Sequence, residues 1–196
     1  TITKELFTND RLKKLLYYDS KDCLDRKSID DIPESEWPLE SPPDKGQNGR
    51  TYICYYPYSS TGDARVNIPK DHEGDPVGAR KFLINNGWRP IPPTASLFGR
   101  NIKVVPKLKI ETEVNNYIVI NFDGFSGNGT NPYYRDNLIE FAVVCHVDSW
   151  YLGDFKLRPF RIAAELDSAL NNKKMSGIGR LQFIGADQII LNDEFA

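Results

Sequence analysis

The chain has 196 residues, of which 40% are hydrophobic and 12% aromatic, and its 25 basic residues nearly balance 27 acidic ones. This length and composition predict a single globular domain over residues 1–196 and exclude a disordered chain. The net charge of −2 argues against a protein whose main task is to bind nucleic acid, because such proteins carry a basic excess.

Membrane and secretory signals are absent from the pattern. No apolar run approaches the ~20 residues that a membrane span needs, and the first residues, TITKELFTNDRLKKLL, are too charged for a secretory signal. The three cysteines, Cys23, Cys54 and Cys145, form neither a disulfide framework nor a Cys-x-x-Cys pair for zinc. We therefore expect a soluble protein that folds in a reducing compartment and has no membrane partner.

Leucines at helical spacing predict a short amphipathic helix at the start of the chain, ending near Tyr18. They are Leu6, Leu12, Leu15 and Leu16. Either Asn9 or Asp10 is expected to cap a second, better helix that runs to about Tyr18, because both side chains accept hydrogen bonds from backbone N–H groups of a first turn.

Residues 28–98 hold ten of the 13 prolines. Proline fixes φ and removes a backbone donor, so helices and central strands are disfavoured there. The same range contains Trp37, Trp88 and the run TYICYYPY at 51–58, whose exposure would be costly. We predict a long irregular insertion within the domain that packs its aromatic side chains on the domain or on a neighbouring chain.

The second half of the chain has a regular pattern. Strands are predicted at residues 102–110, 116–122 and 137–150, from β-branched residues and partial alternation. The segment GFSGNGTNP at 124–132 predicts the turn that joins the last two strands.

A helix is predicted within LRPFRIAAELDSALNN at 157–172. Ile162, Leu166, Ala169 and Leu170 form an apolar stripe, and Pro159 suits a first turn. Two short strands, 179–185 and 187–191, should close the chain. The order of elements predicts an α+β fold: a mixed or antiparallel sheet with helices packed on one face, plus the long irregular Pro- and aromatic-rich insertion.

The stretch IEFAVVCHVDSW at 139–150 contains Cys145, His146 and Asp148, which could form a reaction site. Side chains alternate along a strand, so Cys145 continues an apolar row and points away from His146. The two cannot act together as nucleophile and base. His146 and Asp148 share a face, about 7 Å apart along the strand. We interpret this stretch as the end of a buried strand.

Other sites are less favoured still. Two histidines without ligand spacing predict no metal and no cofactor. The glycine-rich turn lacks the Gly-Lys-Ser/Thr of a phosphate-binding loop. The basic-aromatic segments YYR (133–135) and FKLRPFR (155–161) lack a basic surround, so no sequence-specific nucleic acid is expected. One or both of Arg158 and Arg161 should pair with acids of the same or a neighbouring chain.

The strand and helix of the second half carry a resemblance. A strand of type I-E-F-x-V that leads into a helix of type R-x-I-A-x-x-L-D-x-x-L resembles the neck proteins of tailed bacteriophages, most closely the tail-terminator class. The resemblance covers the C-terminal half and the N-terminal helix, and the 28–98 insertion departs from the compact family pattern. The matching residues are Ile139, Glu140, Phe141 and Val143 in the strand, and Arg161, Ala163, Leu166, Asp167 and Leu170 in the helix.

The resemblance implies a structural protein of the virion, not an enzyme, assembled in the host cytoplasm. Copies of the chain would form a ring, expected to be a hexamer, that caps the tail tube and joins it to the head-completion or connector protein. The residues 28–98 and 123–137 would make the contacts. Tryptophan, tyrosine and arginine anchor interfaces, so the expected contact residues are Trp88, Tyr133, Tyr134, Arg135 and Arg158.

Three alternatives stay open. One is a head-closure or adaptor protein of the same neck. Another, of a different class, is a hydrolase that uses His146 with Asp148. The last is an interaction module of a cellular host with the insertion as its binding face.

Overall fold

The computed structural model describes residues 2–40, 53–54, 75–104, 116–127, 129–130, 135–175 and 179–187. The chain divides into two compact units: unit 1 holds residues 1–29 and 97–196, and unit 2 holds residues 30–96. Helices together with mixed and antiparallel sheets confirm the predicted α+β class. Among the described residues, no helix is long and apolar enough to cross a membrane.

Two short helices open unit 1, α1 (Ile2–Thr8) and α2 (Asp10–Tyr17). Of the two predicted caps, Asn9 is the one observed, and its side chain accepts a hydrogen bond from the Leu12 N–H at 3.0 Å. The four leucines of the predicted apolar face are buried. The burial of this face, rather than the propensity of such short segments, stabilises the two helices.

The sheet of unit 1 is built on a long two-stranded ribbon. Strand β5 (Asn116–Gly127) runs antiparallel to β6 (Arg135–Cys145), and the short β4 (Ile102–Val104) lies parallel to β5. The predicted turn at 124–132 was partly wrong, because β5 continues to Gly127. The pairing register shifts between Asp123 and Phe125, so β5 continues through residues that the sequence pattern assigned to a turn.

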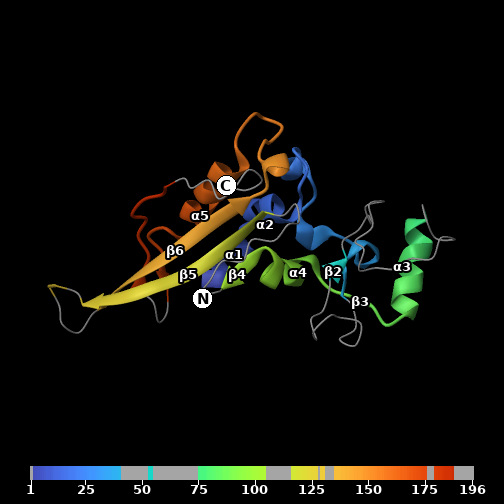
Figure 1. Ribbon diagram of the computed structural model, residues 1–196, viewed down its shortest axis with the longest axis horizontal. Coiled ribbons are helices and arrows are strands. Elements are labelled where there is room, and N and C mark those ends of the chain that lie inside the picture. Colours follow the sequence, from blue (N-terminus) through green and yellow to red (C-terminus); the bar gives the residue numbers. More distant parts are fainter. Residues whose placement is uncertain are drawn as a thin grey trace. The chain divides into compact units, whose positions relative to one another are not determined.

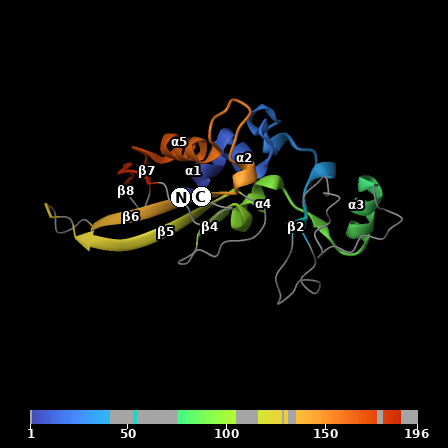
Figure 2. The ribbon, with the colours of Figure 1, turned by 45° about the horizontal axis from the view of Figure 1, so that its top comes forward.

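One face of this sheet is turned toward the helices. Ile118, opposite Val143 in the ladder, is fully buried, and so is Asn116 on the same face. Asn116 Nδ2 donates to Asp19 Oδ1 at 3.1 Å, just after α2. In Figures 1 and 2, α1, α2 and α5 lie on one side of the ribbon, whose far end extends beyond them. Phe122, in the middle of β5, is exposed.

Helix α5 (Arg158–Leu170) confirms the predicted helix, and all four residues of its predicted stripe are buried. After it, Asn172 takes a left-handed conformation (φ 59°) that asparagine tolerates at a helix end. The closing strands were only partly predicted: β8 (Gly179–Arg180) pairs with β7 (Lys174–Met175), and residues 181–187 are not strand. Residues 188–191 lie outside the described residues.

Unit 2 covers nearly the same residues as the predicted insertion. Its strands β1 (Leu39–Glu40), β2 (Ile53–Cys54) and β3 (Arg89–Pro90) form an antiparallel sheet in the order β2-β1-β3. The prediction that helices are disfavoured was wrong for α3 (Pro76–Asn85) and for α4 (Pro93–Arg100), which starts here. Both begin with proline, where the missing N–H has no cost. Of the 3-10 helices in this part of the described chain, Cys23–Asp25 belongs to unit 1, Ile29–Asp31 spans the boundary between the units, and Glu34–Glu36 belongs to unit 2.

Candidate functional site

His146 and Asp148 lie closer together than the strand pattern predicts. Strand β6 ends at Cys145, and His146 caps a 3-10 helix, Val147–Ser149. Its Nδ1 accepts a hydrogen bond from the Asp148 N–H at 3.2 Å and lies 3.5 Å from Asp148 Oδ2. The predicted separation of 7 Å was wrong because the chain turns here instead of continuing as a strand. The interpretation as a strand end is confirmed.

This arrangement differs from that of a hydrolytic site. A catalytic histidine donates its Nδ1–H to a carboxylate and takes a proton from the nucleophile at Nε2. Here Nδ1 is the acceptor of a backbone N–H, which requires the other tautomer. The nearby Ser149 is buried, and its Oγ lies 2.6 Å from Asn116 Oδ1 and 2.9 Å from the His146 carbonyl oxygen. The geometry stabilises a tight turn after β6 rather than a proton transfer.

The cysteine of the same stretch is a buried apolar side chain, as predicted. Cys145 has no exposed surface, and burial raises the pKa of its thiol to about 12, against a smaller opposing effect of the Arg158 charge. Burial also raises the pKa of the Cys23 thiol. Both thiols are free. Because the thiolate is the reactive form, neither is suited to act as a nucleophile.

Arg158, a predicted contact residue, is fully buried in unit 1. Its guanidinium donates to five carbonyl oxygens: Nε to Ser149 at 2.6 Å, Nη1 to Leu15 at 2.8 Å and Tyr18 at 2.7 Å, and Nη2 to Asp19 at 3.2 Å and Ser20 at 2.7 Å. The last carbonyls of a helix have no partner within it and carry partial negative charge. Arg158 thus binds the C-terminal end of α2 to the start of α5.

The other predicted contact residues belong to other parts of the chain or lie outside the described residues. Trp88 is 6% exposed and packs with Leu39 and Leu83 in unit 2. Arg135 is the first residue of β6. Tyr133 and Tyr134 lie outside the described residues.

Arg161 finds the acid that the sequence predicted for it within its own helix. The partner is Glu165, one turn further along α5, with 3.1 Å between Nη2 and Oε1.

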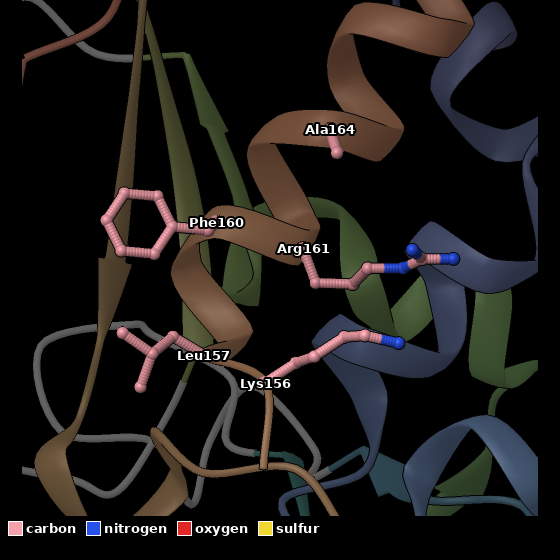
Figure 3. A pocket seen from close by; sticks show the side chains of 5 residues that line it. All are labelled: Lys156, Leu157, Phe160, Arg161 and Ala164. Atoms are coloured by element: carbon pink, nitrogen blue, oxygen red, sulfur yellow. The ribbon is translucent and has the colours of Figure 1, made fainter. Parts of the chain in front are cut away.

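An exposed aromatic surface lies at the start of α5, and sequence reasoning missed it. We call it the 151–164 surface. It comprises the exposed side chains of Tyr151, Phe155 and Phe160, and a shallow hollow of about 290 Å³. The hollow is lined by Lys156, Leu157, Phe160, Arg161 and Ala164 (Figure 3). The only signal in the sequence is the segment FKLRPFR, which does not reveal which aromatic side chains are exposed.

The described side chains form no cation site. In the part of the chain that the structure describes, no group of three or more histidine, cysteine, aspartate or glutamate side chains is placed to hold a metal ion.

Comparison with known families gives a match over two thirds of the chain. The model of the family described as YomW matches residues 66–196. The chain belongs to the YomW family. This family is phage-derived, of the SPβ-like prophage type, so the protein is phage-related. No curated protein and no solved structure matches the chain.

Proposed function

We propose that this YomW-family protein is a structural protein of the phage neck, where copies of the chain form a ring that caps the tail tube and meets the head connector. Its function is to bind other proteins, and it is located in the virion. The observation that carries the proposal is the membership of a phage-derived family, taken with the strand and helix pattern that resembles tail terminators.

The fold of unit 1 supports a role as a rigid building block. Strand β6 leads through the 3-10 helix Val147–Ser149 into α5, in the order that the resemblance requires. Arg158 fixes α5 to α2 through buried hydrogen bonds, so the body keeps its shape when a partner binds. Phe122 and Leu138 of the β5–β6 ribbon and the 151–164 surface expose apolar side chains on this body, as interfaces do before assembly.

Electron microscopy of purified tail tubes mixed with the protein tests this proposal. We expect the protein at one end of each tube only, with copy number measured by native mass spectrometry of the isolated ring. Density on the head connector but not on the tube would favour the head-closure or adaptor alternative. A protein that binds neither, although folded by circular dichroism, would overturn the proposal.

A substitution at His146 separates the proposed role from the hydrolase alternative. His146 caps a turn, and its imidazole accepts a backbone hydrogen bond. A His146→Asn variant retains a side chain that can accept this bond and removes the imidazole. We expect the variant to join tail tubes as well as the wild type does.

A further inference from the structure

The loop between Tyr151 and Leu157 is held in one conformation. These two residues form a β-bridge, and the Leu152 N–H donates to the Lys156 carbonyl oxygen at 2.9 Å. The Gly153 N–H donates to the Lys21 carbonyl oxygen at 2.7 Å, which ties the loop to the segment after α2. The tip of the loop is therefore presented on a fixed base.

Phe155 at this tip combines two unfavourable features. Its φ is 60°, a left-handed conformation that a bulky side chain rarely adopts. Its side chain is also 92% exposed, so the fold gains almost nothing from burying the ring. Glycine or asparagine would suit this position better in an isolated chain. Backbone strain of this kind, held by surrounding hydrogen bonds, gathers at functional positions.

The residues that follow Phe155 in the sequence line a hollow on the surface. The hollow of about 290 Å³ begins at Lys156 and has Leu157, Phe160 and Ala164 as its apolar lining. Figure 3 shows Lys156 and Arg161 extended in a similar direction, with Leu157 and Phe160 turned to the other side. The hollow is shallow and open to solvent, so a ring from another chain would cover its apolar lining rather than be enclosed by it.

The charges that flank Phe155 are self-complementary. Asp154 precedes the ring and Lys156 follows it, and within the chain the two side chains pair at 2.6 Å. If a second copy of this loop lies antiparallel to the first, Asp154 of each copy faces Lys156 of the other. A protruding ring, a hollow beside it and self-complementary charges are the features that a two-fold contact needs, because each copy must offer both halves.

We propose that the 151–164 surface is a contact between two copies of this chain, related by a two-fold axis, in which the two Phe155 rings meet at the axis beside the apolar lining of the hollows. This contact goes beyond the proposed ring, whose neighbours are related by rotation about the ring axis. Either contact can form without the other.

A pair of charge reversals tests the contact. Asp154→Lys places lysine opposite lysine in a self-pair, and Lys156→Asp places aspartate opposite aspartate. Each variant alone should dimerise at least 10-fold more weakly than the wild type in sedimentation velocity at low salt. Mixed in equal amounts, the two variants should form a heterodimer, because the introduced lysine then faces the introduced aspartate and the native Lys156 of one copy faces the native Asp154 of the other. The salt bridge within the chain is lost in both variants, so it cannot explain the recovery.

The substitution Phe155→Gly separates an effect on dimerisation from an effect on the stability of the fold. This variant relieves the backbone, so its melting temperature should not fall, yet it should lose the dimer; Phe183→Gly, which removes another exposed aromatic ring of the described chain, should keep it. A wild-type chain that never pairs, or charge variants that self-associate as the wild type does, would overturn the proposal. Rings that form normally in these variants would leave the proposed function standing.

Discussion

At the junction of α2 and α5, the side chain of Arg158 donates the hydrogen bonds that five carbonyl oxygens would otherwise receive from water. Buried carbonyls need a donor, and the planar guanidinium supplies five N–H groups in a fixed arrangement. No exposed surface of this residue remains, so its role in this chain is internal. The sequence pattern FKLRPFR could not distinguish this role from a contact with a partner, because burial depends on where residues 15–20 lie in the fold.

Arg158→Met should destabilise the protein by more than about 4 kcal/mol, because several buried carbonyl oxygens lose their donor at once. Arg158→Lys should recover little, since an ammonium group has three donors and cannot span the same acceptors. Urea unfolding measures both. The matched control is Arg26→Met, whose exposed ion pair with Asp22 should be worth less than about 1 kcal/mol. Equal effects at the two positions would refute the role of Arg158.

The buried thiol of Cys145 makes stability depend on alkaline pH. Its pKa rises from 9.0 to about 12 in the folded chain, so above pH 9 the unfolded chain releases a proton that the folded chain keeps. The stabilisation is complete below pH 9 and is lost as the pH rises toward 12.

Between these limits the free energy of unfolding should fall by up to about 1.4 kcal/mol per pH unit from this group. Cys145→Ala removes the titrating thiol, so its unfolding free energy should decline less steeply from pH 9 to 10.5. Parallel curves for the variant and the wild type would mean that the thiol already titrates near its ordinary pKa in the folded state.

At the scale of elements, Asn9 joins two helices that are far apart in sequence. Its Oδ1 caps α2, and its Nδ2 donates to Glu165 Oε2 of α5 at 3.1 Å. One amide thus serves as acceptor for one helix and donor for another, which explains why Asn9 rather than Asp10 occupies the cap.

Asn9→Ala should cost about 1–2 kcal/mol, from the lost cap and the lost donor. Asn9→Asp keeps a good cap but faces the Glu165 carboxylate, so it should also destabilise. Adding Glu165→Gln should raise the stability of Asn9→Asp, although the same change lowers that of the wild type by removing the Arg161 ion pair. A double-mutant cycle by urea unfolding measures this change of sign, and additive effects would contradict it.

Periodicity predicted the elements whose burial is regular. The stripe from Ile162 to Leu170 and the strand from Ile139 to Cys145 follow from spacing alone. Two features of the structure did not follow from the spacing of residues. Proline counts suggested that residues 28–98 lack helices, yet Pro76 and Pro93 start helices, where proline is tolerated. The exposure of Phe155 depends on a turn whose left-handed residue is a phenylalanine, and no propensity predicts that choice.

At the scale of the whole molecule, the buried cysteines, His146 and Arg158 serve the interior or a turn, and several apolar side chains are exposed. The thiols are buried, His146 caps a turn, and Arg158 serves the interior. Exposed apolar side chains gather at the 151–164 surface and on the β5–β6 ribbon. An assembly protein with such surfaces should associate with copies of itself as its concentration rises.

Light scattering of the purified protein, across a 100-fold range of concentration, gives the native mass and so tests the assembly role. We predict species well above the 22.3 kDa chain: ring-sized particles, or pairs that grow into rings when tail tubes are added. A mass of 22.3 kDa at every concentration, unchanged by tail tubes, would contradict an assembly role.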